Sequence, residues 1–160
     1  MTKKEDILAQ LLEDIVQRIM DRVPCDISAS MPADQQLIRL IKAHVAGLCR
    51  YPEGKAFILS ESHLLSQRSP EILAVRDQYQ HLLESILQQG VEQGLFHIED
   101  VKLTALAFLG ALNWIPRWFA PDGRLSSEMI GDSYARLLMR ALVMPEKGSP
   151  DSSMHRADEQ

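Results

Sequence analysis

Apolar residues recur along most of the chain at the spacing of three and four residues that is typical of helices with one buried face. Residues 3–23 carry such a stripe, and Thr2 and Glu5 ahead of it are typical of a capped helix N-terminus. A second helix is predicted over residues 32–50, ahead of Pro52. Its inner face would consist of Leu37, Ile41, His44, Val45 and Leu48.

Two more helices are predicted in the middle of the chain. Residues 54–65 fit a short helix; residues 57–59 could form a buried strand instead, but no other strand candidate exists to pair with it. Residues 69–70 supply an N-cap serine and a first-turn proline for a long helix that would end at Gly90 or Gly94. Its inner face would consist of Ile72, Val75, Tyr79, Leu82, Leu83 and Ile86.

The helix predicted over residues 99–119 differs from the others because apolar residues surround its axis. Such a helix must be covered on all sides, so we expect its own core on one side and a second subunit on the other. Pro116 should bend it near its end. Ser126 or Ser127 would then cap a last helix with a broad apolar face, and residues 145–160 form a polar tail that is predicted to be disordered.

Composition and charge limit the class of protein. A chain of 160 residues is one domain by length, and its net charge of -5 argues against a general nucleic-acid-binding surface. Cys25 and Cys49 have neither metal-site spacing nor the number typical of a disulfide scaffold, so a reduced, cytoplasmic protein fits best. The most apolar stretch, residues 103–115, is shorter than the roughly 20 residues that a bilayer requires, so no membrane association is expected.

Few residues suggest chemistry. No nucleophile–base arrangement, phosphate-binding loop or carboxylate pair is evident, so we expect neither enzymatic activity nor a cofactor. Glu61 and His63 lack the spacing of a helical zinc pair, so we expect no metal site. His44 would contact either a ligand or a backbone carbonyl, and Tyr79 would be either a pocket wall or a core tyrosine whose hydroxyl reaches the surface. Asn113 needs a partner if buried, for which an intersubunit or local backbone bond is favoured over a ligand contact.

Residues 94–143 contain a gapped pattern formed by Gly94, Phe96, Asp100, Leu103, Ala105, Gly110, Asn113, Trp114, Trp118, Pro121, Gly123 and Leu125. With this pattern they resemble the ligand-binding and dimerisation domain of TetR-type transcriptional regulators. The resemblance extends to residues 3–143, because a segment like KKEDIL starts the helix that links the DNA-binding unit of such regulators to their ligand domain. The pattern is similar to a branch of the family whose effectors are often acyl-CoA thioesters or related lipid metabolites.

The resemblance implies an all-α fold, an antiparallel bundle of about six helices over residues 1–144 that binds an effector and forms a homodimer through its last two helices. The ligand-binding residues it implies are Ile15, Ile41, His44, Val45, Phe57, Ile58, Tyr79, Leu83 and Ile86. The dimer-interface residues it implies are Phe108, Leu112, Trp114, Trp118, Ile130, Tyr134, Leu137, Leu138 and Ala141.

The implied function is that of a regulator's sensing domain with a small hydrophobic or acyl-CoA-like effector. DNA would be bound only through a helix-turn-helix, which the family carries ahead of a segment like KKEDIL and which the sequence lacks. The alternatives are a stand-alone helical protein that forms heterodimers with full-length relatives, and a lipid-binding module. The sequence does not identify the effector, the regulated genes, or whether the protein represses or activates.

Overall fold

The computed structural model describes residues 17, 30–50 and 70–143, and all regular structure within them is helical. The helices are α2 (Ala33–Arg50), α5 (Pro70–Glu92), α6 (Val101–Asn113), α7 (Ile115–Trp118) and α8 (Ser127–Leu142). The all-α class is therefore confirmed for the described part of the chain. The helices expected over residues 3–23 and 54–65 and the tail over residues 145–160 lie outside the described residues, apart from Gln17, which is helical.

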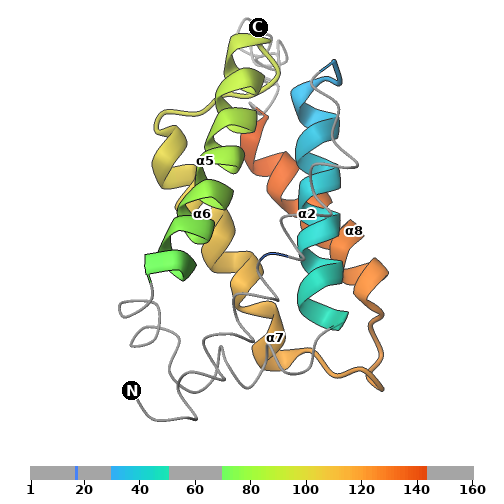
Figure 1. The fold of residues 1–160 in the computed structure, drawn as a ribbon. Coiled ribbons are helices and arrows are strands. Elements are labelled where there is room, and N and C mark those ends of the chain that lie inside the picture. Colours follow the sequence, from blue (N-terminus) through green and yellow to red (C-terminus); the bar gives the residue numbers. More distant parts are fainter. Residues whose placement is uncertain (1–16, 18–29, 51–69, 144–160) are drawn as a thin grey trace, which may run out of the picture.

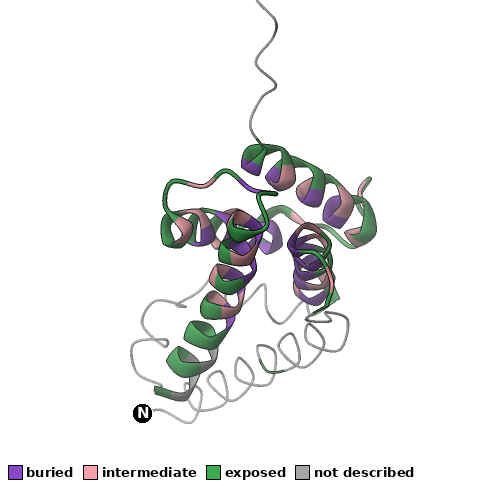
Figure 2. Cartoon of the chain, turned by 90° about the horizontal axis from the view of Figure 1, so that it is seen from above, coloured by how far each residue is buried: buried purple, intermediate pink, exposed green. Residues whose placement is uncertain are grey.

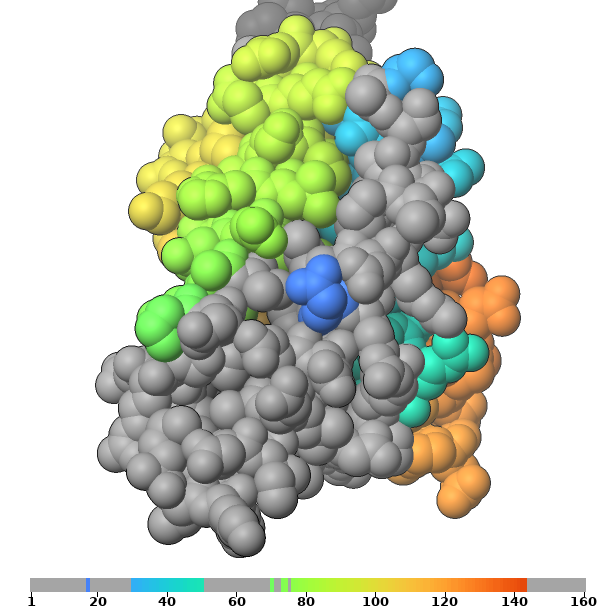
Figure 3. Space-filling model, in the orientation of Figure 1, coloured from blue at the N-terminus to red at the C-terminus, as the bar shows by residue number. Residues whose placement is uncertain are grey.

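The helices form two layers. In Figure 1, α5 and α2 lie in front, α6 and α8 lie behind them, and the short α7 continues α6 at its lower end. Helix α2 packs against both α8 and α5, and α5 packs against α6. Figure 3 shows α5 and α2 on the two sides of the front face, with α8 at the edge beside α2. Helix α2 is therefore central, since it contacts helices of both layers.

The core lies between these layers. In Figure 2 buried and exposed residues alternate along each helix, as expected for helices that have one packed face. No helix among the described residues is long and apolar enough to cross a membrane. The largest side chains that are almost completely buried are Leu37, Leu40, Ile41, Leu83, Leu87 and Ile115.

Two glycines determine how α5 ends. Gly94 has a φ of 70°, the left-handed conformation typical of a helix C-terminus, so of the two glycines considered from the sequence Gly94 is the one that follows the end of α5. Gly90 lies inside the helix, where an added Cβ would come within 2.0 Å of the Phe96 ring. The absence of a side chain at Gly90 therefore lets the ring fold back onto α5, where Phe96 is 6% exposed.

Helices α6 and α8 begin with side-chain caps. The carboxylate Oδ1 of Asp100 accepts a hydrogen bond from the Leu103 N–H at 2.9 Å. The hydroxyl oxygen of Ser126 accepts one from the Met129 N–H at 3.2 Å. Of the two serines considered from the sequence, Ser126 is thus the N-cap of α8.

The single helix expected over residues 99–119 is interrupted, which corrects the prediction. Helix α6 ends at Asn113, and Trp114 joins it to α7. The cause is Pro116, which lacks an N–H and whose ring would clash with the carbonyl four residues earlier in a continuous helix. The disturbance expected from Pro116 is thus observed as a break at Trp114, two residues before the proline.

Candidate functional site

A chain of three hydrogen-bonded side chains joins α2, α5 and α6. The Nδ1 atom of His44 on α2 lies 2.7 Å from the hydroxyl oxygen of Tyr79 on α5. Its Nε2 atom lies 3.1 Å from Oδ1 of Asn113, the last residue of α6. His44 and Tyr79 are only 5% and 7% exposed, whereas Asn113 is exposed. These hydrogen-bonded side chains therefore lead from the interior to the surface at the end of α6.

The protonation state of His44 determines which atom donates in each of these two hydrogen bonds. Burial lowers the pKa of His44 from 6.5 to about 4, against the opposing effect of the Asn113 hydrogen bond, so the imidazole is neutral at pH 7. A neutral imidazole has one donor and one acceptor nitrogen. Because Oδ1 of Asn113 can only accept, Nε2 donates to it and Nδ1 accepts from the Tyr79 hydroxyl. Burial also raises the pKa of Tyr79, which keeps that hydroxyl protonated.

This arrangement differs from the non-ligand alternatives considered for His44 and Tyr79, while a ligand contact for His44 and a pocket-wall position for Tyr79 stay predictions. Neither bond of His44 goes to a backbone carbonyl. The Tyr79 hydroxyl ends at His44 and not at the surface. Asn113 accepts a hydrogen bond from an imidazole 69 residues away in sequence, a partner that the sequence did not suggest, while the expected bond to a second subunit stays a prediction. The sequence signal for Asn113 was a single asparagine in an apolar helix, but that pattern could not reveal its partner.

The other predicted ligand-binding residues lie partly in the same core. His44 and Tyr79 are joined directly, and four apolar members of the predicted set are buried in the core cluster: Ile41, Val45, Leu83 and Ile86. The remaining members, Ile15, Phe57 and Ile58, lie outside the described residues. The ligand-binding role of the whole set stays a prediction.

A second polar bridge, not predicted from the sequence, joins the start of α2 to the end of α5. Gln36, which is 4% exposed, donates from Nε2 to the Met31 carbonyl at 2.6 Å and to Oε1 of Gln89 at 3.0 Å. Oε1 of Gln93 accepts from the Ala33 N–H at 3.0 Å, which satisfies one of the free N–H groups at the start of α2. Gln36 and Gln93 thus satisfy two backbone groups near the start of α2, and Gln89 holds the Gln36 amide in place.

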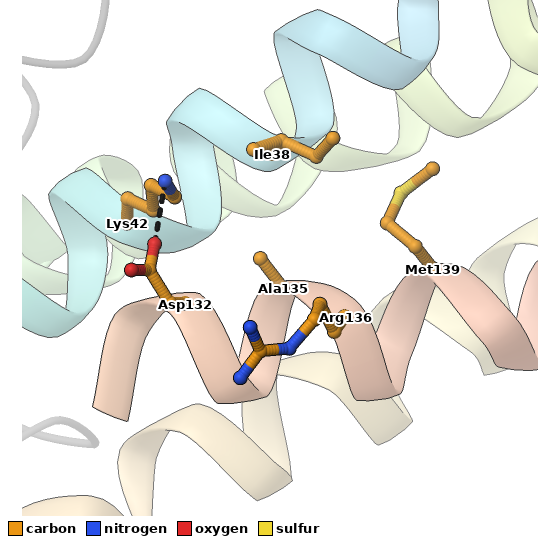
Figure 4. Close-up of a pocket in the computed structure, with 6 residues that line it drawn as sticks. All are labelled: Ile38, Lys42, Asp132, Ala135, Arg136 and Met139. Carbon is orange, nitrogen blue, oxygen red and sulfur yellow. Dashed lines mark ion pairs between the residues drawn. The ribbon is translucent and has the colours of Figure 1, made fainter. Parts of the chain in front are cut away.

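An open groove of about 400 Å³ lies between α2 and α8. Figure 4 shows Lys42 of α2 directed at Asp132 of α8, with Ile38 and Met139 farther along the groove. Lys42 and Asp132 form an ion pair, and the Lys42 hydrogen bond lowers the pKa of the Asp132 carboxyl. Both side chains are about half exposed, so the ion pair contributes little to stability. The groove is not lined by any of the predicted ligand-binding residues.

The predicted dimer residues fall into two groups. Phe108, Leu112, Ile130 and Leu138 are buried in the core of the single chain. Tyr134 is half-buried, and the exposed group is Trp114, Trp118, Leu137 and Ala141. On α6 and α8 three further apolar side chains, Leu103, Leu106 and Met129, are also exposed, although the sequence did not single them out for the interface. The back layer of the fold therefore presents apolar residues outward, while the dimer interface itself stays a prediction.

The region around Trp114 combines aromatic and cationic groups. The guanidinium of Arg117 lies 4.4 Å from the centre of the Trp114 ring, a cation–π contact within α7 and its cap.

Among the described residues no group of three or more His, Cys, Asp or Glu side chains could hold a metal ion.

Solved structures with the same fold are transcriptional regulators. The TetR family regulator PfmR from Thermus thermophilus is 30% identical, with a TM-score of 0.76 over 86% of this chain and 76% of that chain. AibR, in complex with isovaleryl coenzyme A and operator DNA, is 29% identical, with a TM-score of 0.64 over 82% and 74%. The fatty acid degradation regulator FadR from Bacillus halodurans shares the fold at 23% identity, with a TM-score of 0.70 over 85% and 71%. No curated protein matches the chain.

The two-layered helical fold thus defines the class, the C-terminal domain of a transcriptional regulator. The family model described as "Tetracyclin repressor-like, C-terminal domain" matches residues 30–142, and the chain belongs to that family.

Proposed function

We propose that this chain is the effector-binding and dimerisation domain of a TetR-type regulator, and that its effector is a small hydrophobic or acyl-CoA-like molecule. Operator binding is then the task of a helix-turn-helix unit, which the described residues do not include. The chain itself would sense the effector and pair with a second copy.

The observation that carries this proposal is the hydrogen-bonded series of Tyr79, His44 and Asn113, whose two buried members lie beside apolar core residues. Ligand sites of this kind combine apolar walls with a few fixed polar groups. AibR, a relative at 29% identity, was crystallised with isovaleryl coenzyme A, which supports an acyl-CoA-like effector for this chain as well.

The exposed apolar residues of the back layer support the second half of the proposal. Leu103 on α6 and Leu137 on α8 are 65% and 63% exposed in the single chain. Two-fold pairing of α6 and α8 would bury both side chains, as in other four-helix interfaces.

Native mass spectrometry tests both halves of the proposal together. At micromolar concentration the protein should have the mass of a dimer, and one member of an acyl-CoA series should add one ligand mass per chain. Leu137→Glu should weaken the dimer roughly a hundredfold, because each subunit loses a buried leucine and gains a charge at the interface.

The matched control is Leu73→Glu, which introduces the same charge at an exposed leucine on the front layer and should leave the dimer intact. A folded wild-type monomer would refute the pairing. Absence of binding by every acyl-CoA would refute the effector class.

A further inference from the structure

Gly110 is a helical glycine that contacts within the single chain do not explain. It lies in the interior of α6, where glycine is the least favourable residue after proline. At Gly90 the Phe96 ring occupies the space of a side chain, whereas a Cβ added at Gly110 would meet no atom of the described residues within 4 Å. Its φ is not positive either, since Gly94 is the glycine with that conformation among the described residues. The missing side chain instead leaves the α6 backbone open to close approach from outside.

Large apolar side chains flank Gly110 on the same face of α6. Leu106 precedes it by four residues and Trp114 follows it by four, and both are exposed. Residues four apart lie on one face of a helix, and the exposed Leu103 extends this face by another turn. An exposed apolar surface of this kind is typical of a site that a partner covers.

The spacing about Gly110 favours a second copy of the chain as that partner. In a two-fold contact both copies use the same patch, so that residue i meets residue j and j meets i. With antiparallel helices and the axis beside Gly110, Leu106 of one copy lies opposite Trp114 of the other, and the same pair recurs across the axis. The equal spacing of four residues on each side meets this condition, which an unrelated partner would not require.

The different sizes of the two flanking side chains favour the antiparallel direction. In a parallel pair the two Trp114 rings would meet on one side of Gly110 and two leucines on the other, so the larger pair would hold the helices apart at one end. In an antiparallel pair each side combines one tryptophan with one leucine. The two helices can then approach evenly and come closest where the side chain is missing.

We propose that α6 crosses its own copy in the antiparallel direction at Gly110, which lies on the two-fold axis of the dimer. This inference rests on the pairing of two copies under the proposed function and specifies which residues meet at its centre. Gly110 meets its own copy, and Leu106 of each copy packs against Trp114 of the other. The contact needs no effector, so it can be tested on the free protein.

Cysteine cross-linking tests the crossing point. In a chain that carries Cys25→Ser and Cys49→Ala, Gly110→Cys should form a covalent dimer on mild oxidation, because a disulfide requires Cα atoms within about 7 Å. Lys102→Cys is the matched control, since this exposed position of α6 would lie about 24 Å from its own copy in the antiparallel crossing. On non-reducing electrophoresis the linked fraction should be at least about tenfold larger for Gly110→Cys.

Gly110→Leu tests whether pairing depends on the missing side chain. Within the single chain the leucine would enter open space, and it favours a helix more than glycine does, so circular dichroism should show no loss of helix. At the axis two leucines would fill the closest point between the helices, so the dissociation constant of the dimer should rise at least about tenfold. Ser85→Leu, at an exposed position of α5, should leave that constant unchanged.

The outcomes separate this inference from the proposed function. If native mass spectrometry shows a dimer but Gly110→Cys links no better than Lys102→Cys, the inference is overturned and the proposed function stands. An unchanged dissociation constant for Gly110→Leu would have the same meaning. A folded wild-type monomer would refute the proposed pairing, and the inference would fail with it.

Discussion

Two polar bridges join α2 to α5, and they differ in where their hydrogen bonds end. At the start of α2, Gln36 and Gln93 bond to backbone groups at 2.6 and 3.0 Å. In the second half of α2, His44 bonds only to side chains, and the last of these is exposed.

This difference suggests a structural role for the glutamine bridge and a binding role for the bridge through His44. Bonds to backbone groups satisfy donors and acceptors that would otherwise lack a partner, so the glutamine bridge has a structural role in holding the start of α2. The bridge through His44 satisfies its buried members and ends at Asn113, an exposed residue whose side-chain nitrogen has no partner among the described residues. Buried polar residues of the same two helices therefore have different roles, and experiments on stability and on binding should distinguish them.

The largest expected effect is the pH dependence caused by His44. The unfolded chain takes up a proton on this residue near pH 6.5, whereas in the folded chain its pKa is about 4. Between these values the unfolded state binds more protons, so the free energy of unfolding falls as the pH falls. The contribution is roughly 3 kcal/mol, fully present above pH 6.5 and lost on acidification to about pH 4.

Urea unfolding at fixed protein concentration from pH 7 to pH 4 measures this effect. His44→Gln serves as the control, since it removes the titrating group while other acid-sensitive groups remain. Wild type should lose more stability than this variant over the interval. Parallel pH profiles for the two proteins would contradict a buried, neutral His44.

A smaller effect is expected from breaking the glutamine bridge. Gln36→Ala should lower the free energy of unfolding by roughly 2 kcal/mol, because it leaves the Met31 carbonyl without its donor and a cavity beside α5. Gln35→Ala, at the exposed neighbouring position, should change it by no more than about 0.5 kcal/mol.

Ligand affinity also distinguishes the two bridges. Gln36→Ala should leave this affinity unchanged as long as the domain is folded. A variant that is as stable as wild type, or one that is folded but has lost ligand binding, would remove the distinction between the two bridges.

The helices themselves were largely predictable because they depend on local signals. The apolar spacing, the prolines and Gly94 place α2, α5 and α8 close to their observed bounds. The expected helix over residues 99–119 was wrong in its continuity, since the sequence indicates that Pro116 disturbs a helix but not at which residue the helix ends.

The candidate site was only partly predictable. His44 and Tyr79 were identified singly from their positions on inner faces, but their contact joins residues 35 apart in sequence on different helices. The contact with Asn113 depends further on where α6 ends. Such pairings follow from how the helices pack in three dimensions, and one-dimensional periodicity carries no information about them. The same holds for burial, which placed Phe108 in the core and left Leu137 exposed.

The most direct test of the central claim uses the side-chain amide of Asn113. It is the only asparagine in the chain, so selective ¹⁵N-asparagine labelling gives a single side-chain NH₂ signal in an NMR spectrum. Titration with an acyl-CoA that binds should shift this signal in proportion to occupancy, while the side-chain amide of Gln36, observed in a ¹⁵N-glutamine sample, should stay in place. An Asn113 amide that does not respond to a ligand bound at full occupancy would contradict the account.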